Sequence, residues 1–94
     1  VVLVTGATQG IGRAIALECA ASGAQAIVIS GLDQSDGDAV VGEITALGCQ
    51  ARMFVEDLSH SGAAERLFER AIAAFGRIEA LVNAAGVTDR ASTL

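Results

Sequence analysis

The sequence predicts an α/β domain with a doubly wound, parallel sheet. Short β-branched runs alternate with amphipathic helical segments along the 94 residues, and a glycine follows each helical segment. The first apolar run leads through a loop with three spaced glycines directly into a helix. Such alternation implies parallel strands joined by right-handed crossovers. The expected element order is β-α-β-α-β-α-β, with the strands arranged 3-2-1-4, which is the first half of a doubly wound sheet.

Four apolar runs are the expected strands, at residues 1–4, 26–30, 51–55 and 78–82. The first run has no polar residue, as a parallel strand requires when helices cover both of its faces. The segments between the runs have the three- and four-residue apolar spacing of amphipathic helices. The glycines that follow these segments are expected to end the helices in a left-handed conformation. They are Gly23, Gly48 and Gly76.

Each helical segment has a predicted buried face. The first helix is expected to bury Ile11, Ala14, Ile15 and Cys19. The second, over about residues 38–47, is expected to bury Val40, Ile44 and Leu47, with residues 31–37 as a polar connection before it. The third has Ser59 or Ser61 as its expected N-cap. Its apolar stripe comprises Ala64, Leu67, Phe68, Ala71, Ile72 and Phe75.

The loop after the first strand contains three glycines, each suited to a different role. Gly6 can adopt the backbone angles of a tight turn. Gly10 lacks a Cβ, so the backbone can lie close to a bound pyrophosphate, and Gly12 allows the helix to pack near the strand. The N-terminus of the helix then offers unpaired N–H groups and a partial positive charge to an anion. The sequence therefore predicts a phosphate-binding loop.

The spacing Gly-x-x-x-Gly-x-Gly differs from the Gly-x-Gly-x-x-Gly of the most common dinucleotide fingerprint. Residues 5–12, Thr-Gly-Ala-Thr-Gln-Gly-Ile-Gly, instead resemble the Thr-Gly-x-x-x-Gly-Ile-Gly signature of the short-chain dehydrogenase/reductase family. The resemblance implies a partial Rossmann-type NAD(P)-binding domain over residues 1–94. It also implies that six loop residues contact the cofactor, namely Gly6, Thr8, Gln9, Gly10, Ile11 and Gly12.

Two later stretches resemble the same family and follow the third and fourth strands. Asp57-Leu58 is similar to an acid–apolar pair whose carboxylate accepts a hydrogen bond from the adenine amino group, a donor that suits a carboxylate. The simpler interpretation of Asp57 is an acid near a helix start. Asn83-Ala84-Ala85-Gly86 resembles the family's Asn-Asn-Ala-Gly beside the nicotinamide ribose, with Ala84 replacing the second Asn. The first Asn of that motif ties neighbouring strands together, so Asn83 is expected to be structural rather than catalytic.

The choice between NAD and NADP depends on the end of the second strand. An acid there normally binds the ribose hydroxyls of NAD, and a nearby Arg accepts the 2′-phosphate of NADP. Here Gly31 occupies the acid position, Leu32 the position often filled by Arg, and Gln9 a position where NADP-dependent members often carry a cation. Asp33 could reach the ribose, or could instead cap the second helix. Because this loop has several acids and no cation, the sequence slightly favours NAD.

The residues that the family uses for catalysis are absent from these 94 residues. They are a Tyr, a Lys four residues later and a Ser, whereas this chain has no Tyr or Lys and its Ser residues precede the expected position. Both ends look cut, so we expect a segment of a longer protein. The resemblance implies that the complete protein transfers hydride between the cofactor and a carbonyl or secondary alcohol, and forms a tetramer or dimer. The alternative is a non-catalytic dinucleotide-binding or interaction module, which a reading frame continuing into Tyr-x-x-x-Lys would exclude.

Composition argues against several other classes of function. The net charge is −5 with six Arg and no Lys, whereas a nucleic-acid surface relies on clustered cations. No apolar run reaches the ~18 residues of a membrane span. Cys19, Cys49 and His60 lack the spacing of metal ligands. Buried, reduced thiols in a cytoplasmic protein are the expectation.

Overall fold

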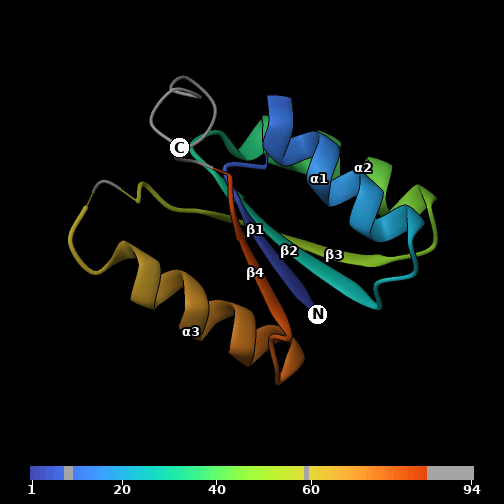
Figure 1. Cartoon of the computed structure of the whole chain (residues 1–94). Coiled ribbons are helices and arrows are strands. Elements are labelled where there is room, and N and C mark those ends of the chain that lie inside the picture. The colour runs from blue at the N-terminus through green and yellow to red at the C-terminus, as the bar shows by residue number, and fades with distance from the viewer. Residues whose placement is uncertain (8–9, 59, 85–94) are drawn as a thin grey trace.

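The computed structural model describes residues 1–7, 10–58 and 60–84. These residues form a four-stranded parallel sheet and three helices (Figure 1). The elements are β1 Val2–Thr5, α1 Gly10–Ala21, β2 Ala26–Gly31, α2 Gln34–Ala46, β3 Gln50–Val55, α3 Ala63–Phe75 and β4 Ala80–Asn83. The strands lie in the order β3-β2-β1-β4, and all three neighbouring pairs are parallel. The predicted alternation and strand order are confirmed.

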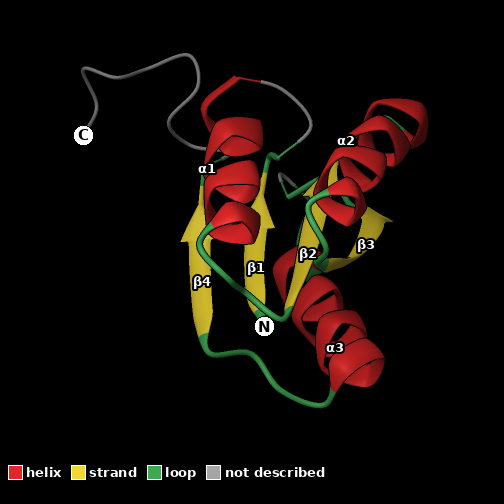
Figure 2. Cartoon of the chain, turned by 90° about the vertical axis from the view of Figure 1, so that its right-hand side faces the viewer, coloured by secondary structure: helices red, strands yellow, loops and turns green. Residues whose placement is uncertain are grey.

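The helices cover both faces of the sheet, with α1 and α2 on one side and α3 on the other (Figures 1 and 2). Side chains along β2 alternate between these two layers. Ile27 and Ile29 pack in the core under α1 and α2, together with Ile44. Val28 packs in the core under α3, together with Leu67. Full burial of such a side chain stabilises the fold by about 1.5–3 kcal/mol, so β2 needs apolar residues on both of its faces.

Left-handed glycines end the helices as predicted. Gly76 has φ 83° and donates its N–H to the carbonyl of Ile72, which closes the last turn of α3. Gly23 and Gly48, after α1 and α2, also have positive φ values of 100° and 86°. A residue with a Cβ is strained in this region, so the three glycines fix where each helix stops.

The start of α2 differs from the prediction. The helix begins at Gln34 rather than near residue 38, because Asp33 caps it. The Oδ1 atom of Asp33 accepts hydrogen bonds from the N–H groups of Ser35 at 2.8 Å and Asp36 at 3.1 Å. Gly37, expected in a polar connection, is buried inside the helix and lies against the side chain of Met53. The N-cap side chain accepts hydrogen bonds from the first N–H groups of the helix, so a polar stretch that reads as a loop can be helical.

The buried face of α1 was predicted correctly only in part. The fully buried residues are Gly12, Ala16 and Ala20, whereas Ile11 is 48% exposed and Ala14 is exposed. The other two predicted residues, Ile15 and Cys19, pack against the core at its margin. The helix lies so close to the sheet that only the smallest side chains fit between them. Leu47 is a second error of this kind, since it is the C-cap of α2 and is 51% exposed.

The third helix has a narrower buried face than predicted. Leu67 and Ala71 are buried, and Ile72 and Phe75 are partly buried, but Ala64 and Phe68 are exposed. Its N-cap is Gly62 with φ 80° and no side-chain hydrogen bond, so Ser61 does not cap it; Ser59 lies outside the described residues.

The outer strands are shifted slightly from their predicted ranges. β3 begins one residue earlier, at Gln50, and β4 spans Ala80–Asn83 rather than residues 78–82. β4 is an edge of the described sheet, and Leu81 on it is 59% exposed. None of the helices in the described part of the chain combines the length and the apolar character needed to cross a bilayer.

Candidate dinucleotide-binding site

The carboxyl ends of the four strands meet at one edge of the sheet. The strands end at Thr5, Gly31, Val55 and Asn83, and the register pairs Thr5 with Asn83 and Gly31 with Val55. In open α/β sheets, ligands bind outside this edge where the chain order reverses, which here is between β1 and β4. The predicted site residues in the described part of the chain follow or end these strands, apart from the three that open α1.

The three glycines of the loop lie within the described residues, and their backbone geometry can be compared with the prediction. Gly6 has φ 65° and turns the chain out of β1. A Cβ on Gly12 would lie 2.1 Å from the carbonyl oxygen of Gly6, so a larger residue cannot occupy this position without moving the loop or the helix. Gly10 has φ 59°, and beyond its chain neighbours and its own helix backbone, no heavy atom of the described residues lies within 4 Å of where its Cβ would stand. The start of α1 is therefore held against the end of β1, with open space in front of Gly10.

Hydrogen bonds tie the strand ends to one another at this edge. The N–H of Ala7 donates to the carbonyl of Ser30 at 3.0 Å, which joins the glycine loop to β2. The N–H of Glu56 donates to the carbonyl of Gly31 at 3.1 Å, which joins the end of β3 to the end of β2. The Thr5 hydroxyl donates to the side-chain oxygen of Asn83 at 2.9 Å, and this bond performs the strand-tying role predicted for Asn83.

Three predicted site residues, Gly31, Leu32 and Asp33, follow one another at the end of β2. Gly31 is partly buried and Leu32 is exposed. Of the two roles open to Asp33, the structure shows the capping role, and both cap hydrogen bonds end on Oδ1. The capping bonds do not use the second carboxylate oxygen, Oδ2.

The end of β3 places Asp57 and Leu58 at the same edge. The N–H of His60 donates to the carbonyl of Asp57 at 3.0 Å, so the chain turns directly after the strand. The Oδ2 atom of Asp57 lies 3.6 Å from Nε2 of His60. Leu58 is partly buried against the core under α3. His60 was missed as a neighbour of this site, although its position three residues after Asp57 in a turn was the available signal.

Glu56 is a second residue that the sequence did not single out. Its side chain is only 8% exposed, and its two carboxylate oxygens contact Arg66 and Arg70 of α3 at 3.4 and 3.2 Å. The guanidinium of Arg70 also lies 4.4 Å from the centroid of the Phe54 ring. The spacing of the two arginines, four residues apart on one helix face, was the only sequence signal.

Of the remaining predicted site residues, two lie within the described part of the chain. Ala84 is buried in the core under α1 and α2, and Ile11 is half exposed at the start of α1. Four predicted cofactor contacts lie outside the described residues: Thr8, Gln9, Ala85 and Gly86.

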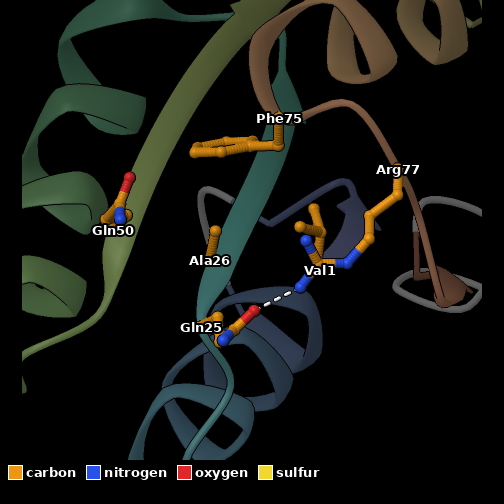
Figure 3. A pocket seen from close by; sticks show the side chains of 6 residues that line it. All are labelled: Val1, Gln25, Ala26, Gln50, Phe75 and Arg77. Atoms are coloured by element: carbon orange, nitrogen blue, oxygen red, sulfur yellow. Dashed lines mark hydrogen bonds between the residues drawn. The ribbon is translucent and has the colours of Figure 1, made fainter.

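A cavity of about 290 Å³ lies at the opposite edge of the sheet, where the strands begin (Figure 3). It is lined by Val1, Gln25, Ala26, Gln50, Phe75 and Arg77. The Arg77 guanidinium donates a hydrogen bond to the side-chain oxygen of Gln25 beside it. Because it adjoins the amino ends of the strands, this cavity is separate from the glycine loop. Among the described residues, no three His, Cys, Asp or Glu side chains are grouped so that they could hold a metal ion.

Comparison with known proteins agrees with this geometry. The family model of the short chain dehydrogenases matches residues 1–94. The chain is 46% identical over 87 residues to 1,6-dihydroxycyclohexa-2,4-diene-1-carboxylate dehydrogenase of Acinetobacter baylyi, covering 92% of this chain and 32% of that enzyme. It is 40% identical over 88 residues to 3-oxoacyl-[acyl-carrier-protein] reductase of Synechocystis, covering 94% of this chain and 36% of that enzyme.

A solved structure gives the same result. A dehydrogenase from Burkholderia cenocepacia, described as putative and crystallised with bound NADP, superposes with a TM-score of 0.83 at 32% identity, covering 87% of this chain and 32% of that one. The chain thus spans about a third of the length of each of these proteins. The match over the full length, the strand order and the glycine loop lead to one conclusion: the chain belongs to the short-chain dehydrogenase family.

Proposed function

We propose that this chain binds a nicotinamide dinucleotide at the carboxyl edge of its sheet, and that the complete protein transfers hydride between nicotinamide C4 and a carbonyl or secondary alcohol. The observation that carries the proposal is the glycine loop, in which Gly12 approaches Gly6 so closely that no side chain fits. The bound cofactor supplies the hydride chemistry. The residues of this chain bind and orient it.

The loop residues fit a pyrophosphate group. The Cβ position of Gly10 faces open space, so an anion can come close to the backbone there. The first N–H groups of α1 have no partner within the helix, and the helix dipole favours negative charge at this end. Gly6, Ile11 and Gly12, with Thr8 and Gln9, complete the proposed phosphate site.

Other strand ends are proposed to hold the two ends of the dinucleotide. Asp57 would accept a hydrogen bond from the adenine amino group, with Leu58 beside the ring. Backbone groups of Asn83 and Ala84, with those of Ala85 and Gly86, would pass beside the ribose of the nicotinamide. No catalytic residue is assigned within this chain, since the Tyr and Lys that the family uses are absent from it.

We also propose that NAD is preferred over NADP. Asp33 stands at the end of β2, and its Oδ2 atom is not used in capping α2. Asp36 and Asp38 follow in the first turns of that helix. The chain has no Lys or Arg between Arg13 and Arg52, and Arg13 is held in an ion pair with Glu43 that raises its pKa. The local charge therefore disfavours a 2′-phosphate, although a similar dehydrogenase was crystallised with NADP.

The substrate is proposed only as a carbonyl or secondary alcohol. The names of the two similar enzymes give different substrates, a 3-oxoacyl-[acyl-carrier-protein] and 1,6-dihydroxycyclohexa-2,4-diene-1-carboxylate, so no narrower class follows. We further propose a cytoplasmic, dimeric or tetrameric complete protein. The unpaired cysteines, Cys19 and Cys49, are consistent with a reducing compartment.

Calorimetric titration of the 94-residue chain with NADH and with NADPH tests the proposal, after circular dichroism has established that the chain is folded. We expect saturable binding of both, with NADH at least several-fold tighter. Absence of binding by a folded chain would contradict the dinucleotide site. Tighter binding of NADPH would leave the site intact but refute the preference for NAD.

A further inference from the structure

Glu56 is the most deeply buried carboxylate among the ion pairs of the described residues. Its side chain is 8% exposed, whereas the acids of the other pairs are 39–54% exposed. A buried carboxylate is unfavourable unless its oxygens are paired. Here Oε1 accepts from Arg66 and Oε2 accepts from Arg70, so each oxygen has its own guanidinium. The buried carboxylate and its two arginine partners, whose own side chains are 53% and 47% exposed, distinguish this contact from the other ion pairs of the described residues.

The two arginines extend from successive turns of α3 to the end of β3. Arg66 and Arg70 are four residues apart, so they lie on the same side of the helix. Arg70 contacts both Glu56 and the ring of Phe54, two residues earlier in the chain. Alternate residues of a strand share a face, so Phe54 and Glu56 both face α3. We call Phe54, Glu56, Arg66 and Arg70 the Glu56 cluster.

Glu56, which directly precedes Asp57, is held by contacts to two different elements. The N–H of Glu56 is bonded to the carbonyl of Gly31 in β2, and its carboxylate is bonded to α3. From Asp57 the chain turns at once. The N–H of His60 donates to the carbonyl of Asp57, and the N–H of Ala63 donates to the carbonyl of His60. Both ends of this short turn are thus anchored, at β3 and at α3.

We propose that Glu56 is a positioning residue for adenine recognition: through Arg66 and Arg70, it holds the end of β3 so that the Asp57 carboxylate meets the adenine amino group. The inference rests on the proposed dinucleotide function and adds a specificity role to residues outside the glycine loop. The N-cap of α3, Gly62, makes no side-chain hydrogen bond, and the Glu56 cluster is a polar contact between the first turns of α3 and the end of β3. Loss of the cluster would let Asp57 move relative to β2, and a hydrogen bond depends steeply on its geometry.

The test compares NADH with its hypoxanthine analogue, which carries a carbonyl oxygen in place of the adenine amino group. The ratio of their dissociation constants reports the contact between Asp57 and that amino group. We expect the native chain to bind NADH at least about 10-fold more tightly than the analogue, the effect of a hydrogen bond to a charged group. General loss of stability lowers both affinities equally and does not change the ratio.

Glu56→Gln should reduce the ratio to about 1–3, because the amide oxygen can accept from only one arginine and its NH₂ group faces the other. Asp57→Asn should reduce it similarly, and the double variant should show no further reduction. Glu43→Gln, which removes the carboxylate paired with Arg13 on another helix, is the matched control and should keep the native ratio. If Glu56→Gln does not fold, Arg66→Gln, which keeps the Arg70 contact, should give an intermediate ratio.

The possible outcomes distinguish the positioning role of Glu56 from the proposed dinucleotide binding. An unchanged ratio in Glu56→Gln, with a collapsed ratio in Asp57→Asn, would overturn the positioning role alone. A native ratio near 1 would overturn both the adenine contact and the positioning role. Failure of the folded native chain to bind either nucleotide would overturn the dinucleotide function itself.

Discussion

The Thr5 hydroxyl donates a hydrogen bond to the side-chain oxygen of Asn83 at 2.9 Å, across the last paired residues of β1 and β4. Thr5 is buried, and β4, a strand of only four residues, has one neighbouring strand within the described part of the chain. The side-chain bond between Thr5 and Asn83 holds β4 against β1 at the point where their backbone pairing ends. It also holds Asn83 at the same edge as the glycine loop, so one contact serves both the sheet and the site.

Removal of this contact should destabilise the fold by about 0.5–1.5 kcal/mol, the net value of one hydrogen bond. Thr5→Val keeps the shape of the side chain and removes the donor, and Asn83→Ala removes the acceptor. Urea denaturation of the two single variants and the double variant gives the coupling free energy. Strictly additive losses would show that the two side chains do not stabilise each other.

The space in front of Gly10 gives a second prediction. Gly10→Ala and Gly48→Ala both place a Cβ on a left-handed residue, at φ 59° and 86°. In neither case does the Cβ come within 4 Å of a described heavy atom beyond its chain neighbours and, for Gly10, its own helix backbone. Each should lose about 1 kcal/mol of stability from backbone strain. Only Gly10→Ala should also weaken NADH binding, by about 10-fold or more, because its methyl group occupies the proposed pyrophosphate space.

Thermal denaturation and calorimetric titration of both variants provide the measurements. Gly48 precedes β3 at the opposite edge of the sheet, so its variant controls for strain alone. Equal NADH affinity in the two variants would refute the assignment of Gly10 to the phosphate site.

Asp33 gives a third prediction, because capping and charge can be separated there. Asparagine also caps helices well, so Asp33→Asn should keep the stability of the chain, whereas Asp33→Ala should lose about 1 kcal/mol. Both variants remove the carboxylate and should reduce the preference for NADH over NADPH several-fold. The comparison needs urea denaturation for the cap and titration with both nucleotides for the charge. Retention of the native preference in Asp33→Asn would exclude the carboxylate as its source.

Much of the fold could be predicted because its signals are local. The apolar runs, the helical spacing and the glycines at 23, 48 and 76 each act within a few residues, and they define the order of elements. The order of the strands then follows from the handedness of the crossovers. The buried face of α1 could not be predicted in this way, since close approach to the sheet selects Gly12, Ala16 and Ala20 by size rather than by hydrophobicity.

The candidate site shows the same division. Gly6, Gly12 and Asn83 have backbone or side-chain contacts that follow from their motifs. Glu56 could not be identified, because its partners lie 10 and 14 residues away on the following helix and meet it only after the chain has folded back. The early start of α2 depends on the Asp33 cap, which competes with a ribose-binding role for the same residue.

Cys49 gives the last prediction, which concerns pH. Burial raises the pKa of its thiol above the usual value, because the charged thiolate is disfavoured in the core. A group with a raised pKa in the folded state stabilises the fold fully below its unfolded pKa of about 8.5, and that contribution is lost as pH rises through the folded pKa. The free energy of unfolding should therefore fall above pH 8.5, by at most about 1.4 kcal/mol per pH unit from this one group.

Urea denaturation of the native chain and of Cys49→Ala at pH 7.5, 8.5 and 9.5 measures the effect. The free energy of unfolding of the variant should show the shallower decline with pH. Identical slopes would mean that the thiolate of Cys49 forms in the folded chain as easily as in the unfolded one, which its burial against the α2 layer of the core argues against.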